Sequence, residues 1–219
     1  LHPTQFGIIC PVETPDGGNI GIKKHMTIMS NITFGIDPLP IVNLLLQLNV
    51  RELETLDPVL IYNTTKIFIN GKWIGIHEEP IKLVHILRLY RRNGMINVFT
   101  SINWDIKSNE LHILTDGGRC CIPLYILENN KVILNQDHLK LLKEKKINWY
   151  NFVGGFNDKQ LDYYSSDVVC NDFTINDYEK IVSSLSGTSG IIEYLDVDEI
   201  TNIMLAFNVN SMKKMMKYS

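Results

Sequence analysis

Two acidic residues, Glu13 and Asp16, lie three positions apart in the stretch PVETPDGGNIG, residues 11–21, and are the first candidates for chemistry. Paired carboxylates perform general acid and base catalysis when their surroundings drive their pKa values apart. Pro11 and Pro15 restrict the backbone and would hold both side chains rigidly. Acidic residues in such a Pro-Gly turn nevertheless more often end strands and cap helices, so a rigid bend is the favoured interpretation.

The same segment contains residues suited to two other kinds of site. Its glycines, Gly17, Gly18 and Gly21, would let backbone N–H groups approach an anion. A phosphate-binding loop, however, is typically followed by Lys and Ser or Thr between a strand and a helix, and that pattern is missing. Cys10 with His2 or His25 would form a nucleophile and its base, but a cysteine within GIIC is more often a small core residue.

The cysteines and the composition exclude several classes of protein. The four cysteines are Cys10, Cys120, Cys121 and Cys170. They form no CxxC, so the sequence predicts neither structural zinc nor a disulfide framework, and it favours a reducing compartment. No apolar run approaches the roughly 20 residues of a membrane span, so no membrane is expected. The net charge of −3 argues against a general nucleic-acid-binding surface, although local contacts stay possible.

The secondary-structure elements that follow residue 21 must position the segment of residues 11–21. Asp37 and Pro38 predict the start of a helix through IVNLLLQLNV, which is apolar on nearly every side and is expected to be buried. Asn70-Gly71 lies between two strand-like runs in residues 66–76 and predicts a type I′ hairpin. Glu79-Pro80 begins a second helix, and Gly94 suits a left-handed cap at its end.

Three arginines lie near the end of the second helix: Arg88, Arg91 and Arg92. Cations favour the negative end of a helix dipole, so a solvated last turn is the preferred interpretation and a phosphate clamp the alternative. The runs INVFTSINWDI, ELHILTD and RCCIPLYIL predict strands. NQDHLKLLKEKK predicts an amphipathic helix whose KEKK run is solvent-exposed, and FVGGFND predicts a loop. Thr174 predicts a helix start, GIIEYLD a strand, and VDEITNIMLAF either a short helix or a strand.

Residues 1–33, LHPTQFGIICPVETPDGGNIGIKKHMTIMSNIT, resemble the fork region of the second-largest subunit of multisubunit DNA-directed RNA polymerases. That family's pattern runs H-P-x-x-[WFY]-G, then C-P-x-E-T-P-E-G, a glycine-bearing turn and a basic-apolar strand. Further landmarks resemble the external region of the eukaryotic, archaeal and large DNA virus branch: GIDPLPIV, FINGKWIGIHEEP, LRLYRRNGMIN, DGGRCCIPLYI, VGG and IIEYLDVDE. Asp16 and Phe6 depart from the commoner Glu and Trp. TPDGGNIGIKKH is most similar to polymerases of large DNA viruses.

The resemblance implies an enzyme of which this chain is one part. In the family, aspartates of the largest subunit hold the catalytic magnesium, and this chain is expected to contribute no catalytic, cofactor-binding or metal-binding residue and to be inactive alone. Glu13 would lie near the active centre, on a bend shaped by Pro11, Thr14, Pro15, Asp16 and Gly17. The implied partners are the largest and smaller subunits, the DNA template and RNA. The implied location is the nucleus for a cellular enzyme, or the virion and the host cytoplasm or nucleus for a viral one.

The sequence therefore predicts a mixed α+β fold with mostly antiparallel sheets and packed helices. Expected segments are the distal fork at 1–36, the external region in two parts at 37–133 and 134–208, and a tail at 209–219. Leu1 in place of an initiator methionine favours a piece of a longer polypeptide. Composition alone would also fit a stand-alone soluble interaction or scaffold module without catalysis. The rigid, Gly-rich first segment argues against that alternative, because a stand-alone module would have no role for such a segment without a neighbouring surface.

Overall fold

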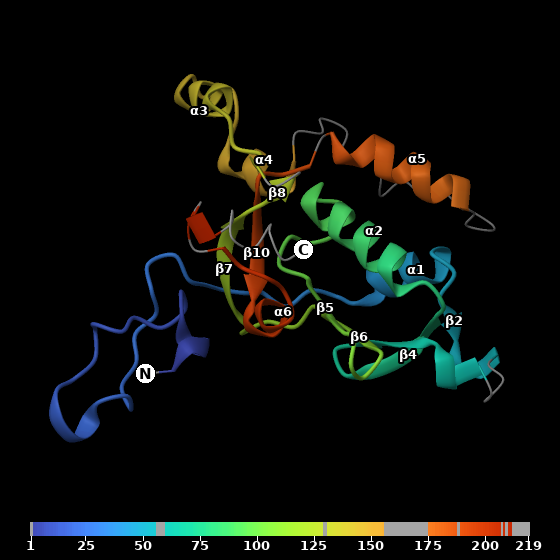
Figure 1. Ribbon diagram of the computed structural model, residues 1–219, viewed down its shortest axis with the longest axis horizontal. Helices are drawn as coiled ribbons and strands as arrows, with labels where there is room; N and C mark the ends of the chain where they lie inside the picture. Colours follow the sequence, from blue (N-terminus) through green and yellow to red (C-terminus); the bar gives the residue numbers. More distant parts are fainter. Residues whose placement is uncertain are drawn as a thin grey trace.

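The computed structural model describes residues 2–55, 60–128, 131–155, 175–187, 189–206, 208 and 210–211 (Figure 1). Helices and largely antiparallel sheets confirm the predicted α+β class. Of the features predicted above, Cys170, Thr174 and most of the 209–219 tail lie outside these ranges. No helix among the described residues is both long and apolar enough to cross a membrane.

A five-stranded sheet forms the larger core. Its strands, in spatial order, are β2 (Arg51–Glu52), β4 (Lys72–His77), β3 (Thr65–Ile69), β6 (Glu110–Leu114) and β5 (Ser101–Asp105). All neighbours are antiparallel except β3 and β6, which are parallel. Asn70 (φ 48°) and Gly71 (φ 81°) connect β3 to β4 with the positive φ angles of the predicted type I′ turn. Thr65, Ile67 and Ile69 alternate onto the buried face.

Helices α1 (Leu39–Gln47) and α2 (Pro80–Arg92) pack on that face. Helix α1 begins one residue later than predicted, and the Asp37 carboxylate accepts the Leu39 N–H at 3.0 Å. The expectation that α1 is buried on nearly every side is wrong. Ile41 and Leu45 are buried, whereas Leu39 is 61% exposed, because only one side of the helix meets the sheet.

A second, three-stranded antiparallel sheet joins distant parts of the chain. It consists of β1 (Asn31–Ile32), β7 (Cys120–Tyr125) and β10 (Ile192–Asp196), with β7 in the centre. Helix α6 (Val197–Thr201) follows β10 directly, which decides between the two structures left open for this stretch. The sheet takes one strand from each of the segments expected at 1–36, 37–133 and 134–208. The boundaries of those segments stay a prediction.

The remaining strands and helices lie outside the two main sheets. The short strands β8 (Leu127–Glu128) and β9 (Lys131–Val132) pair with each other. Helix α3 (Gln136–Lys143) is the predicted amphipathic helix, and α5 (Ile175–Ser186) runs beside α2 in Figure 1. Helix α4 (Trp149–Gly154) includes the first three residues of the predicted FVGGFND loop, so that prediction is wrong for residues 152–154, while residues 156–158 lie outside the described ranges. These residues are helical because Phe152 and Val153 pack into a core with Ile191 and Ile192.

Short 3₁₀ turns complete the described chain. They are Pro3–Gln5, Gly17–Asn19, Leu53–Thr55 and Leu60–Asn63. The first two lie in the N-terminal arm, residues 2–36, which extends to one side of the molecule in Figure 1. The larger sheet lies toward the opposite side.

Candidate functional site

The predicted bend, residues 11–21, belongs to a protruding loop, residues 11–24, that is held at its base by backbone hydrogen bonds. Ile9 and Met26 form an antiparallel bridge. Beside it, the Cys10 N–H donates to the His25 carbonyl at 2.8 Å, and the Thr27 N–H donates to the Ile8 carbonyl at 2.9 Å. Cys10 and His25 are thus joined through their backbones, as neighbours in a hairpin-like base.

Side chains inside the loop stiffen it and occupy the glycine amides. The Asp16 carboxylate accepts the Gly17 N–H at 2.9 Å and caps the following 3₁₀ turn. The Thr14 hydroxyl accepts the Gly21 N–H at 3.3 Å. Two of the N–H groups that an anion would need are therefore already bonded. Gly17 (φ 81°) and Gly21 (φ 79°) serve the chain reversal.

Glu13 points its carboxylate toward solvent near the base of the loop. Its side chain is 66% exposed, and Oε1 lies 3.8 Å from Nδ1 of His25. The Glu13 N–H donates to Sγ of Cys10 at 3.4 Å. An ion pair as exposed as that of Glu13 and His25 is strongly screened by water. Glu13 and Asp16 have different partners, so the structure does not bring them together as a catalytic dyad.

The arm around this loop exposes many large apolar side chains. The most exposed are Phe6, Val12, Ile20, Ile22, Ile28, Met29 and Phe34. Isolated exposed apolar residues are ordinary, but a series of them along one segment is typical of a surface that contacts another surface. The arm thus has the character of an interface in addition to carrying Glu13.

The main electrostatic feature of the body is a buried ion-pair cluster around Arg91, which is 2% exposed. Its Nη1 donates to Oε2 of Glu199 at 2.7 Å, and its Nη2 donates to Oε1 at 2.8 Å. Arg91 Nε donates to Oε1 of Glu193 at 3.1 Å, and Nη1 also donates to the Thr100 carbonyl at 2.7 Å. The Ile102 N–H donates to Glu199 at 3.2 Å. The cluster joins α2, β5, β10 and α6.

The charges of this cluster stabilise one another. Burial by itself would raise the pKa of Glu193, but Arg91 and Arg92 overcome it and lower the pKa to about 2. Arg92 contributes Nη2 at 3.0 Å from Oε2 of Glu193. A second pair lies alongside, in which Nη1 of Arg119 donates to Oδ2 of Asp196 at 2.6 Å. The Asp196 Oδ1 atom accepts the Glu199 N–H at 2.9 Å and so caps α6.

The interpretation of Arg88, Arg91 and Arg92 as a solvated last turn is wrong for Arg91. The end of α2 lies against β10 and α6, whose carboxylates neutralise the guanidiniums in the interior. Glu193, Asp196 and Glu199 were not predicted from the sequence as partners of arginines. The available signal was the acidic run EYLDVDE, which stands more than one hundred positions from the arginines.

Within the described residues, no group of three or more His, Cys, Asp or Glu side chains is placed to hold a metal ion. Cys10, Cys120 and Cys121 are free thiols. Burial raises the pKa of the Cys121 thiol to about 11, so this cysteine is a packing residue and a poor nucleophile at neutral pH.

Two stretches of the chain match known protein families. Residues 1–32 match the family described as RNA polymerase Rpb2, domain 3, and residues 67–128 match RNA polymerase Rpb2, domain 4. The DNA-directed RNA polymerase II subunit RPB2 of Encephalitozoon cuniculi is 33% identical over 208 residues, 95% of this chain and 15% of that protein. The protein of that name from Schizosaccharomyces pombe is 33% identical over 215 residues, 95% of this chain and 16% of that protein.

A relative from another polymerase class agrees. The DNA-directed RNA polymerase III subunit RPC2 of Saccharomyces cerevisiae is 31% identical over 179 residues, 77% of this chain and 16% of that protein. These relatives are second-largest subunits of DNA-directed RNA polymerases, and the chain corresponds to a part of such a subunit. The chain belongs to the Rpb2 family, in which it corresponds to a region that includes domains 3 and 4. It spans only about one sixth of the length of these relatives.

Proposed function

We propose that this chain is a working part of a DNA-directed RNA polymerase, in which it supports the active centre and the assembly of subunits during template-directed RNA synthesis. The observation that carries the proposal is the alignment of 95% of the chain with RNA polymerase II second-largest subunits at 33% identity. The alignment includes the N-terminal arm, whose exposed, rigid loop has no catalytic partner among the described residues.

In this proposal, Glu13 organises the nucleotide pocket from a position near the base of a stiff loop. Pro11 and Pro15 limit the backbone, Thr14 and Asp16 bond the glycine amides, and the Glu13 carboxylate stays exposed. A preorganised charge near reacting groups lowers the barrier without binding metal. Gly17 supplies the turn that returns the chain toward Met26.

The other components of the reaction come from partners. The magnesium ion of the enzyme is assigned to aspartates of the largest subunit, and this chain supplies no ligand to it. The arm faces the largest subunit, the DNA template and the RNA, and the body contacts smaller subunits. As part of a cellular polymerase II or III, the chain acts in the nucleus. Origin from a large DNA virus, with a virion or host-cell location, stays a prediction based on the TPDGGNIGIKKH stretch, while the relatives above are eukaryotic.

The test is Glu13→Gln in the full-length subunit of the assembled polymerase. The substitution keeps the shape and removes the charge, so we expect single-nucleotide addition on an RNA-DNA scaffold to slow by roughly 10- to 100-fold, or misincorporation to rise, with assembly intact. Loss of a metal ligand would instead nearly abolish synthesis. Glu54→Gln, an exposed glutamate in the 3₁₀ turn after β2, is the control. Unchanged addition and fidelity in Glu13→Gln would remove the active-centre role.

A purely structural role for Glu13 makes a different prediction. Glu13 would then only support the bend, and Glu13→Gln would lower the stability of the chain by about 1 kcal/mol while sparing RNA synthesis. Thermal melting of the 219-residue chain beside the kinetic assay separates the two roles of Glu13.

A further inference from the structure

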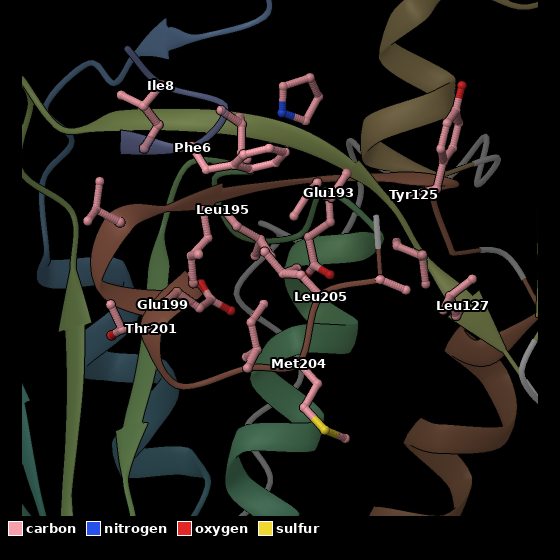
Figure 2. A pocket seen from close by; sticks show the side chains of 18 of the residues that line it. Phe6, Ile8, Tyr125, Leu127, Glu193, Leu195, Glu199, Thr201, Met204 and Leu205 are labelled. Carbon is pink, nitrogen blue, oxygen red and sulfur yellow. The ribbon is translucent and has the colours of Figure 1, made fainter. Parts of the chain in front are cut away.

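A hollow of about 730 Å³ lies against the three-stranded sheet, on a side that α2 also lines. Figure 2 shows its side chains coming from the arm, from β7 and β10, and from the segment after α6. Its walls are largely apolar. They include Phe6, Ile122, Leu124, Leu195, Met204 and Leu205. The structure thus brings four separate stretches of sequence together around one apolar space.

The floor of the hollow carries charge. Arg88, Arg92, Glu193 and Glu199 line it, and Arg91 lies buried beneath. The three arginines of α2 meet two glutamates, so this cluster has one positive charge in excess. Arg91 and Arg92 are hydrogen-bonded to the glutamates, whereas the shortest ion pair of Arg88 within the described residues is 3.9 Å, from Nε to Oε1 of Glu199.

Arg88 is therefore the guanidinium of this cluster that is placed to donate hydrogen bonds to a further anionic partner. Its side chain is 32% exposed, and the hollow that it lines is largely apolar. A carboxylate that enters an apolar site forms stronger hydrogen bonds with a guanidinium than it does in open water. Apolar side chains that flank this carboxylate in the bound partner would pack against the apolar walls of the hollow.

The rim indicates an occupant larger than a small molecule. Phe6 is 63% exposed, Tyr125 58% and Met204 75%, although all three line the hollow. Small-molecule sites bury most of their ligand, whereas a groove with an exposed apolar rim fits a chain that continues beyond it. The chain's own final residues, MKKMMKYS, carry three lysines and no acidic group, so their charge does not match the floor.

We propose that this hollow is a docking site for a partner polypeptide, which inserts a carboxylate side chain flanked by apolar side chains beside Arg88. The inference goes beyond the proposed polymerase function and rests on the hollow alone. It is tested by peptide binding to the 219-residue chain, without RNA synthesis. A failure of peptide binding leaves the polymerase proposal unchanged, and a failure of the Glu13→Gln experiment leaves the docking proposal unchanged.

The probe is a fluorescein-labelled, C-terminally amidated peptide, Leu-Leu-Glu-Leu-Phe, measured by fluorescence polarisation. Versions with Gln or Lys in place of Glu report the contribution of the charge. We expect the Glu peptide to bind about five- to tenfold more tightly than the Gln peptide, and the Lys peptide to bind most weakly. Palmitate serves as a competitor that tests a lipid occupant.

Two variants locate the site. Arg88→Met keeps an apolar stem and removes the charge, so the Glu and Gln peptides should bind equally. Met204→Glu adds a negative charge at an exposed rim position and should weaken the Glu peptide. Arg51→Met, at an exposed arginine paired with Glu78, is the control and should change nothing. Melting curves verify that each variant is folded.

Several outcomes would overturn the proposal. They are absence of peptide binding to the folded chain, equal affinity for the Glu and Gln peptides, and an unchanged charge preference in folded Arg88→Met. Binding of palmitate that is tighter than that of the Glu peptide would assign the hollow to a lipid instead. If Arg88→Met fails to fold, Met204→Glu decides alone, and unaltered binding in that variant counts against the site.

Discussion

The N-terminal arm and the body of the molecule use their apolar residues in opposite ways. Among the arm residues whose burial is described, only Ile8 and Thr33 are buried, and Ile28 is fully exposed. In the body, Ile67, Leu45 and Leu111 are completely buried between α1, α2 and the larger sheet. The body buries its apolar side chains in its own core, whereas the arm leaves most of its apolar side chains exposed.

This difference explains why the chemically suggestive residues lie where they do. The Pro-Gly loop is held by its own backbone and side-chain bonds, so it can be rigid without a core beneath it. The body, in contrast, hides its strongest charges. Glu13 therefore stays available to a partner surface, while Arg91 and Glu199 connect α2 to α6.

The largest expected effect comes from Arg91→Met. Removing this guanidinium leaves Glu193 and Glu199 buried without their main counter-charge, which should cost about 3–5 kcal/mol of unfolding free energy. Urea denaturation of the chain measures it. Arg51→Met, whose ion pair with Glu78 is half exposed, should cost less than about 1 kcal/mol. Similar losses in both variants would show that the buried cluster does not stabilise the body.

Matched truncations compare the arm and the body directly. Ile67→Ala, in the core, should cost about 2–5 kcal/mol, because it leaves a cavity between the sheet and the helices. Ile28→Ala, in the arm, should change the unfolding free energy of the same chain by less than about 0.5 kcal/mol. A large loss in Ile28→Ala would mean that the arm packs in solution, and the contrast drawn above would fail.

Glycine substitutions sharpen the same contrast. A Cβ atom at Gly75 would lie 2.2 Å from the Arg51 carbonyl oxygen, so Gly75→Ala should separate β2 from β4 and cost about 1–3 kcal/mol. A Cβ atom at Gly18 meets no heavy atom within 4 Å. Gly18→Ala should therefore melt at nearly the wild-type temperature, and a marked drop would contradict the description of the loop as self-contained.

Acid should weaken the body through Glu193. Because its pKa is lowered to about 2 in the folded state, its charge stabilises the protein above the ordinary pKa near 4.5, and this contribution is lost as the pH falls toward 2. Between pH 5 and pH 3, we expect a loss of about 1–2 kcal/mol from this group. Urea titrations at several pH values should give a shallower acid dependence for Glu193→Gln than for wild type. Parallel profiles would argue against the lowered pKa.

Local features were predictable from the sequence because neighbours along the chain produce them. The Asn70-Gly71 turn needs only two residues that accept positive φ angles, and Glu79-Pro80 begins α2 as expected. The bend at 11–21 also followed from its prolines, glycines and capping Asp16. The family resemblance, which depends on residue order, was likewise readable and is confirmed by the comparisons.

Only the tertiary structure decided what surrounds Arg91. From its position near the end of α2, solvation and burial were both compatible with the sequence, since the helix dipole favours a cation there in either case. Its partners Glu193 and Glu199 lie 102 and 108 positions away, and packing of β10 and α6 against α2 brings them within hydrogen-bond distance. The hollow over Arg88 depends on the same packing. The sequence by itself determined the turns, the caps and the family, whereas long-range packing determined which charges are buried and which surfaces stay open.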